Sequence, residues 1–426
     1  MITKLRPIRN LRWIIAGLMC LATALNYLDR QTLSVLASTI QKDLGMSNVE
    51  YAKVTRAFLL SYTIMYLVSG RIIDTVGTRL GMLISVLAWS GANLLHAFAR
   101  TAAQLSMFRF LLGATEAGNF PTCVKASSEW FPPRERALAV GVVNAGVALG
   151  SAISVPLVSF VALKFGWQSA FVVTGALGLV CAGLWAAFYR LPADHPRLSS
   201  EEKEWILAGR DNQPTAGSDQ PRPSLLKLLG MRETWGCALA RVLTDPISYF
   251  MYFWIPKYLQ DERGFDLKQT GTWGWIPFVA LAVGSIASGA IPRALVARGV
   301  SLNRARKMTM LSASCVIPVL CLSIPRVSSP ATAVALVTAL MFSHALWGNI
   351  TLPAEVFPGR VVGTITGLGG ALGGLAGFLS QQAIGRISAA GSFAPLFAAC
   401  GVMYVAAFIV VAWLLRDLGR IRAIAS

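Results

Sequence analysis

The chain has 426 residues, of which 55% are hydrophobic and 14% charged, and its formal net charge at pH 7 is +18. Soluble domains carry about 25% charged residues, so this composition excludes a soluble protein and indicates a polytopic membrane protein. The basic residues are scattered between apolar segments and do not form one face, which excludes nucleic-acid binding and favours retention of Lys and Arg in cytoplasmic loops.

Apolar segments of spanning length predict an all-α fold of twelve transmembrane helices in two six-helix halves. The first six lie at about residues 13–37, 54–73, 80–98, 104–124, 137–161 and 168–189. The second six lie at about 236–258, 272–292, 308–325, 331–353, 361–384 and 393–415. The predicted organisation is a bundle over 1–189, a cytoplasmic linker over 190–235, and a second bundle with its tail over 236–426.

Lys and Arg gather at both ends of the chain and between spans 8 and 9, whereas the opposite connections hold few. This bias predicts that both termini are cytoplasmic. In the linker, Ser199 and Glu202 have the spacing of a helix-capping box, so a short helix is expected there, followed by a flexible segment over 212–223. The linker is too short for a catalytic domain, and the seven cysteines show no CxxC or Cys/His spacing, so neither an enzyme nor a metal site is predicted.

A repeat supports the two-half organisation. Glu-Trp-Phe-Pro-Pro-Arg at 129–134 precedes span 5, and Glu-Val-Phe-Pro-Gly-Arg at 355–360 precedes span 11. In each copy a glycine, Gly141 or Gly367, follows the glutamate by twelve residues. The constant offset favours duplication over chance.

Four charged residues fall inside predicted spans of the first half. Asp29 and Arg30 lie in span 1, while Arg109 and Glu116 lie nearly two turns apart on one face of span 4. A charge at the centre of such a helix costs about 2.5–3.5 kcal/mol, so these residues should face the bundle interior and mark a pathway for an ion or substrate. An anion bound to one arginine would leave a carboxylate free to take up a proton. A purely structural ion network is the alternative.

The connection between spans 2 and 3 has the pattern GxxxDxxGxR at Gly70, Asp74, Gly77 and Arg79. It resembles the signature loop of the major facilitator superfamily. We expect the glycines to permit a tight turn, and Asp74 to pair with Arg79 or with the cluster of Arg134 and Arg136, as a latch that breaks when the cytoplasmic side opens.

The second half holds Arg241 and Asp245 in span 7, spaced as an i,i+4 ion pair, and a substrate role for them stays open. His344, Trp347 and Asn349 cluster in span 10 and are candidate cavity-lining residues.

A closer resemblance covers almost the whole chain. Residues 26–30, 109–121, 125–132, 167–171, 235–239 and 264–268 are similar to the anion:cation symporter family, and within it to bacterial hexuronate and aldonate or aldarate transporters. The resemblance implies proton-driven uptake of an organic anion across the bacterial inner membrane. It implies proton-carrying roles for Asp29 and Glu116 and substrate contacts for Arg30, Tyr62 and Tyr27.

The chain departs from its galactonate-type relatives, because Val147 and Gly370 stand where polar substrate-binding side chains are expected. It departs from the hexuronate type as well, which lacks the Asp29 carboxylate. The sugar's hydroxyl contacts must then come from elsewhere in the chain.

The sequence therefore predicts a monomeric secondary transporter with no cofactor, which imports a sugar acid with protons by alternating access. In this scheme Arg30 anchors the carboxylate, Asp29 and Glu116 exchange protons, and Arg109 tunes them. Import of another carboxylate, such as an aromatic acid or tartrate, is the first alternative. A membrane sensor built on a transporter fold is the second.

Overall fold

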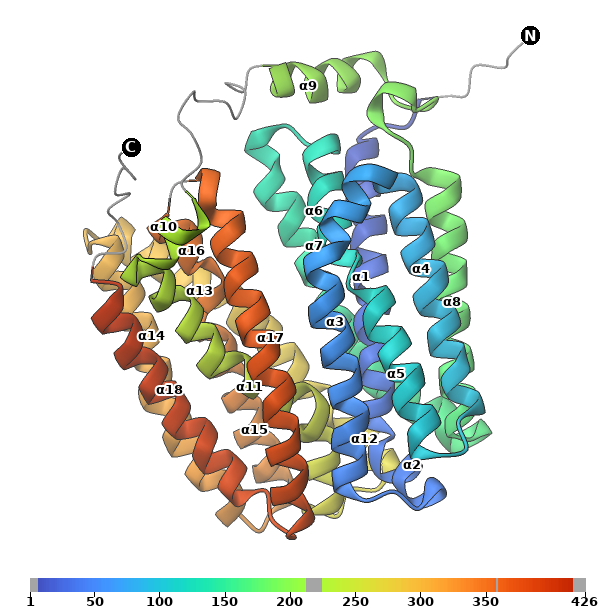
Figure 1. Ribbon diagram of the computed structural model, residues 1–426, viewed down its shortest axis with the longest axis vertical. Helices are drawn as coiled ribbons and strands as arrows, with labels where there is room; N and C mark the ends of the chain where they lie inside the picture. The colour runs from blue at the N-terminus through green and yellow to red at the C-terminus, as the bar shows by residue number, and fades with distance from the viewer. Residues whose placement is uncertain (1–6, 212–223, 358, 417–426) are drawn as a thin grey trace.

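The computed structural model describes residues 7–211, 224–357 and 359–416, which form helices with no strand among them. The N-terminal half contains α1 (Leu11–Val35), α2 (Ala37–Leu44), α3 (Asn48–Val76), α4 (Thr78–Leu95), α5 (Ala102–Glu116), α6 (Asn119–Trp130), α7 (Pro133–Phe165) and α8 (Trp167–Phe188). The connection between the halves carries α9 (Ser200–Asp211) and α10 (Leu225–Leu229). The C-terminal half contains α11 (Arg232–Asp261), α12 (Leu267–Trp273), α13 (Ile276–Ala297), α14 (Leu302–Ser323), α15 (Pro330–Trp347), α16 (Leu352–Val356), α17 (Gly359–Ala389) and α18 (Ala394–Leu414). The two halves stand side by side as two bundles (Figure 1).

Within the described residues, 10 stretches are long and apolar enough to cross a membrane. They correspond to all the predicted spans except 4 and 7, and those two are helical as well, as α5–α6 and α11. Both exceptions carry charge at membrane depth, which lowers their hydropathy without removing them from the bundles. The predicted all-α membrane fold is confirmed.

Three spans that the sequence predicts as continuous are broken, which corrects the expected helices at 104–124, 272–292 and 331–353. Breaks separate α5 from α6, α12 from α13, and α15 from α16. Gly348 ends α15 with φ 58°, a conformation that residues with a Cβ rarely adopt. The break after α5 makes Glu116 the last residue of that helix.

The predicted signature loop is mostly helix. α3 continues to the residue before Gly77, so Gly70 and Asp74 lie in its last turns and not in a loop as the pattern suggested. Gly77 alone joins α3 to α4, with φ 84°. A Cβ on Gly81 would overlap the side chain of Ile73, so this glycine lets α4 approach α3 closely.

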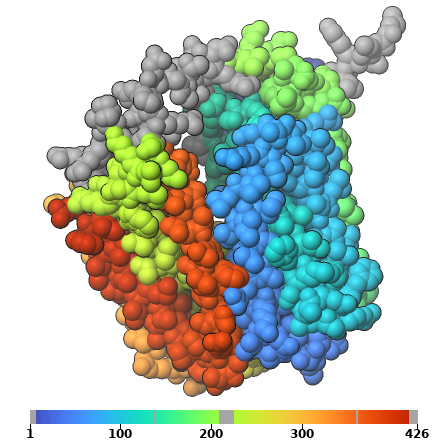
Figure 2. All heavy atoms as spheres, viewed as in Figure 1, coloured from blue at the N-terminus to red at the C-terminus, as the bar shows by residue number. Residues whose placement is uncertain are grey.

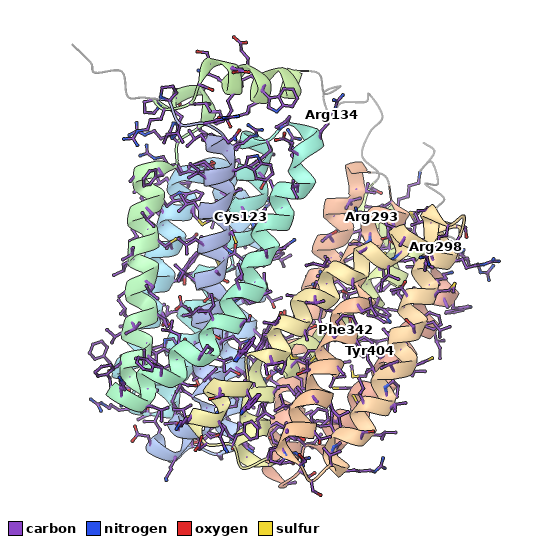
Figure 3. All side chains as sticks on the ribbon, turned by 180° about the vertical axis from the view of Figure 1, so that it is seen from behind. Cys123, Arg134, Arg293, Arg298, Phe342 and Tyr404 are labelled. Carbon is purple, nitrogen blue, oxygen red and sulfur yellow. The ribbon has the colours of Figure 1, made fainter. Side chains whose placement is uncertain are left out.

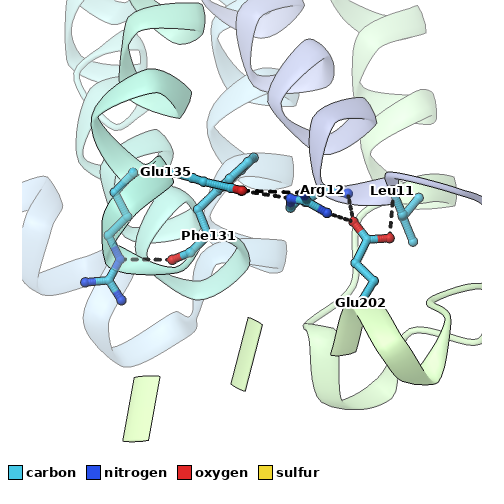
Figure 4. A network of polar contacts seen from close by, with 6 residues as sticks. Leu11, Arg12, Phe131, Glu135 and Glu202 are labelled. Atoms are coloured by element: carbon cyan, nitrogen blue, oxygen red, sulfur yellow. Dashed lines mark hydrogen bonds and ion pairs between the residues drawn. The ribbon is translucent and has the colours of Figure 1, made fainter. Parts of the chain in front are cut away.

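α9 is tied to the N-terminal half by a three-residue ion network (Figure 4). Arg12 at the start of α1 pairs with Glu135 of α7 over 2.9 Å and with Glu202 of α9 over 2.8 Å. Glu202 also accepts hydrogen bonds from the Leu11 and Arg12 amides. The Ser199 hydroxyl accepts from the Glu202 amide as the capping-box pattern predicts, but the Glu202 carboxylate binds α1. The segment 212–223, expected to be flexible, lies outside the described residues.

The glutamates of the two repeat copies contact equivalent helices, although through different partners. Glu129, near the end of α6, accepts hydrogen bonds from Thr78 at the start of α4 and from Tyr189. Glu355 in α16 pairs with Arg306 near the start of α14. Each glutamate therefore connects the segment before a long helix, α7 or α17, to the third span of its own half.

The halves are joined by hydrogen bonds at the end of the molecule opposite the termini and α9 (Figure 1). Ser34 donates to the Tyr252 carbonyl over 2.7 Å, and Tyr51 donates to the Phe253 carbonyl over 2.8 Å. Thr55 of α3 contacts Gln381 of α17 over 3.0 Å. Toward the other end a crevice separates the halves in the space-filling view (Figure 2).

The end with the crevice carries exposed basic residues from both halves. Seen from behind, Arg134 of the N-terminal half and Arg293 and Arg298 of the C-terminal half lie at this end (Figure 3). Phe342 and Tyr404 lie deeper in the C-terminal bundle in the same view. The open end therefore carries basic residues from connections that the Lys and Arg bias predicts to be cytoplasmic.

Candidate functional site

The charged residues predicted at membrane depth in the first half come together between α1 and α5. Arg30 donates from Nε to Oε2 of Glu116 over 2.6 Å. The Glu116 side chain is fully buried, and that of Arg30 is 10% exposed. Because the pair joins two helices, it fixes the guanidinium at the inner face of the bundle.

Asp29 is fully buried and binds a neutral partner instead of an arginine. Asn93 of α4 donates to its Oδ1 over 2.7 Å, and the same amide contacts Thr174 of α8 over 2.6 Å. Asp29 also lies within electrostatic range of Glu116 and Arg109. The sequence did not single out Asn93 and Thr174, although an Asn inside an apolar span was an available signal.

Several polar atoms of this cluster are buried and have no hydrogen-bond partner among the described residues: Asn26 Nδ2 and Oδ1, Asp29 Oδ2, Arg30 Nη2, Arg109 Nε and Nη2, and Glu116 Oε1. Buried polar groups are paired in the great majority of cases, so unpaired ones gathered in one place indicate a site for water, a proton or a ligand. The four charged groups sum to zero, which lowers the free energy needed to bury them.

Aromatic rings surround the Arg30 guanidinium. Its carbon lies 4.4 Å from the Tyr62 ring centre, 4.7 Å from that of Tyr27 and 5.2 Å from that of Phe58. Tyr27 in turn contacts Tyr252 of the C-terminal half edge-on, with 5.9 Å between ring centres. The predicted grouping of Arg30, Tyr27 and Tyr62 is therefore present in the structure, and it lies where the two halves meet.

The span 10 candidates divide into three different environments. Trp347 is buried and donates from Nε1 to Ser314 of α14 over 2.8 Å, and its contact with a substrate stays a prediction. Both ring nitrogens of His344 are engaged, one by Ser248 of α11 and the other by Tyr404, and its substrate role also stays a prediction. Asn349 also reaches α11, where it donates to Thr244 over 2.6 Å.

The expected partners of Asp74 are corrected as well. Asp74 pairs with Lys125 of α6 over 2.9 Å. Arg79 donates to the Ala186 carbonyl instead, and Arg134 is exposed. The reason is the helical extension of α3, which turns Asp74 toward α6. With its carboxylate 73% exposed, this is a surface pair of small energetic weight.

Two helical bundles whose described residues include ten stretches long and apolar enough to cross a membrane, and a buried charge cluster inside the first bundle, are typical of a polytopic membrane transporter. The family model of the Major Facilitator Superfamily matches residues 19–381, and the chain belongs to this family.

The chain is similar to transporters of sugar acids. It is 35% identical to a hexuronate transporter of Escherichia coli strain K12, over 93% of this chain and 92% of that protein. It is 38% identical to a galacturonate transporter of Dickeya chrysanthemi, over 67% of this chain and 82% of that protein. A solved D-xylose-proton symporter shares the fold, with a TM-score of 0.75 at 13% identity and coverage of 96% of this chain and 99% of that one.

Proposed function

We propose that the chain imports a sugar acid, such as a hexuronate or an aldonate, together with protons by alternating access. The observation that carries the proposal is the contact of Arg30 with Glu116 beneath the rings of Tyr27 and Tyr62. It combines an anion-binding cation, a titratable acid and ring surfaces at the junction of the halves. The similarity to hexuronate and galacturonate transporters supports the same substrate class.

Arg30 is the carboxylate anchor in this proposal. A guanidinium binds carboxylates in a planar, two-pronged geometry, and Glu116 engages its Nε while Nη2 has no partner among the described side chains. The rings of Tyr27 and Tyr62 cover the guanidinium faces, so a ligand must approach in the plane of its N–H groups. The tyrosine rings also offer apolar surface to the C–H face of a sugar.

Glu116 and Asp29 are the proton carriers. A substrate carboxylate that binds Arg30 competes directly with Glu116 for the guanidinium. Two anions next to one buried arginine are unfavourable. Proton uptake by Glu116 removes this conflict and keeps the cluster neutral. Asp29, held by Asn93, is a second acid within the same electrostatic environment, and the buried charge of Arg109 tunes both.

Alternating access would proceed by opening the hydrogen-bonded end and closing the crevice. The contacts of Ser34, Tyr51 and Thr55 with the C-terminal half would open in the opposite state. Because Arg134, Arg293 and Arg298 lie at the open end, we assign that end to the cytoplasm of a bacterial inner membrane, with both termini inside. The state described here would then face inward.

An aromatic carboxylate is the second candidate substrate, because Tyr27, Tyr62 and Phe58 form an aromatic wall around the anchor. Thermal unfolding of the purified protein with glucuronate, galacturonate, galactonate, tartrate and benzoate separates the candidates. Stabilisation by a sugar acid and not by benzoate supports the proposal. Stabilisation by benzoate alone would replace it with the second candidate.

A further inference from the structure

A second ion pair lies in the C-terminal half, on α11. Arg241 Nη2 and Asp245 Oδ2 are 2.8 Å apart, and the Arg241 Nε atom donates to the same oxygen over 3.0 Å. The side chains of Arg241 and Asp245 are 20% and 11% exposed, whereas that of Glu116 is fully buried. Part of each side chain of this pair is therefore exposed near the middle of a long bundle helix, where a ligand can contact it.

The facing helix, α17, leaves room for this pair. A Cβ on Gly373 would overlap the Asp245 carboxylate, and a Cβ on Gly370 would lie 3.1 Å from Nη1 of Arg241. The Arg241 guanidinium therefore occupies the space that a side chain at position 370 would fill. Position 370 of α17, where a polar side chain is expected, holds a glycine, and the Arg241 guanidinium of α11 provides a polar group in its place.

Tyrosines near the pair also border the Arg30 anchor, since Tyr66 stacks on Tyr62 with 5.8 Å between ring centres. Tyr66, on α3 of the other half, lies within electrostatic range of Arg241. Tyr249 lies one turn beyond Asp245 on α11, about 6 Å along the helix axis, and is within electrostatic range of both Asp245 and Arg30. Asn349 adds an amide beside Thr244, next to Asp245 in sequence.

We propose that Arg241, Asp245 and Asn349 form the subsite for the hydroxyl-bearing end of the sugar acid, and that Asp245 selects monocarboxylates over dicarboxylates. The inference rests on the proposed function, because it assumes that Arg30 holds the substrate carboxylate.

The chemistry of the pair fits hydroxyl groups. A sugar hydroxyl both donates and accepts, and the pair offers an accepting carboxylate beside a donating guanidinium. The pair is neutral overall, so it has no net attraction for a second anion. A carboxylate at the far end of an aldarate would meet the Asp245 carboxylate, and like charges in an occluded site repel each other.

The test compares glucuronate, with one carboxylate, and glucarate, with two, for binding to the purified full chain. Wild type is expected to prefer glucuronate. Asp245→Asn keeps the shape but removes the negative charge beside Arg241, so the ratio of glucuronate to glucarate affinity should fall about 10-fold or more. Asp245→Ser gives the same readout if the amide variant does not fold, and Asp245→Glu should retain the preference.

Asp261→Asn is the matched control, since Asp261 is paired i,i+4 with Lys257 on the same helix but at the hydrogen-bonded end. It should leave the affinity ratio unchanged. If wild type binds glucuronate and the ratio stays the same in the neutral Asp245 variants, the subsite assignment is wrong while the proposed function stands. If wild type binds none of the hexuronates, aldonates and aldarates, the proposed function is wrong and the subsite assignment that rests on it falls too.

Discussion

The Nε atom of Arg30 donates to Oε2 of Glu116 over 2.6 Å, in a bundle interior where the glutamate is fully buried. The anchor for an anionic substrate is thus already occupied by an acid of the protein. Binding and proton uptake are coupled in such an arrangement, because the acid must release the arginine before a substrate carboxylate can take its place.

Arg30→Ala should abolish glucuronate-dependent stabilisation of the purified protein. Loss of a buried charge-assisted contact weakens binding by about 2–5 kcal/mol, which is more than tenfold in affinity. Arg30→Lys should recover only part of the affinity, because an ammonium lacks the two-pronged geometry. The control Arg100→Ala changes an exposed arginine outside the bundles and should bind like wild type. Unchanged ligand stabilisation in Arg30→Ala would show that the anchor is misassigned.

Glu116→Gln should separate binding from proton coupling. The amide preserves the size of the side chain and leaves Arg30 free, so glucuronate binding and substrate exchange across vesicles should persist. Accumulation driven by a proton gradient should be lost, since the proton carrier is gone. Glu201→Gln, at an exposed position of α9, serves as the matched substitution. Gradient-driven accumulation by Glu116→Gln at the wild-type rate would rule out this residue as the carrier.

Trp347→Phe tests the assignment of this residue to the bundle interior. Removal of the hydrogen bond to Ser314 should lower stability by about 1–3 kcal/mol, visible as a lower Tm, because a buried partner is left unpaired. The additional shift in Tm on adding glucuronate should equal that of wild type. If Trp347→Phe loses the ligand-induced shift in Tm while the fold is retained, Trp347 contacts the substrate.

Gly385→Leu should stop transport without unfolding the chain. A Cβ at this position would overlap Ala52 of α3, so a larger side chain prevents the hydrogen-bonded end from closing. Gly183→Leu introduces the same side chain on α8, where a Cβ would meet no atom within 4 Å, and should transport within about twofold of wild type. Normal uptake by Gly385→Leu would contradict the need for this closed end.

The sequence was most informative where charge enters a membrane. Asp29, Arg30, Arg109 and Glu116 could be recognised because a charge at membrane depth must be compensated by partners, and the structure brings the four together. Asn93 was missed because a neutral amide in a span carries a much weaker signal. The pairing within the cluster also depends on how α1, α4 and α5 pack, which local periodicity does not report.

The side-chain partners that the sequence did not predict are those on neighbouring helices. Asp74 was expected to bind the arginine that follows it, but α3 continues as helix and turns the carboxylate toward Lys125. His344 and Trp347 looked like cavity residues because polar and aromatic groups share one span. In the structure His344 contacts Ser248 and Tyr404, and Trp347 contacts Ser314, and the pattern within one span does not predict these partners.

The most direct test of the central claim is uptake of radiolabelled glucuronate or galacturonate by proteoliposomes under an inward proton gradient. The account predicts accumulation above the external concentration that collapses when a protonophore dissipates the gradient. Absence of gradient-driven uptake for every hexuronate, aldonate and aldarate, from protein that is folded and inserted, would contradict it.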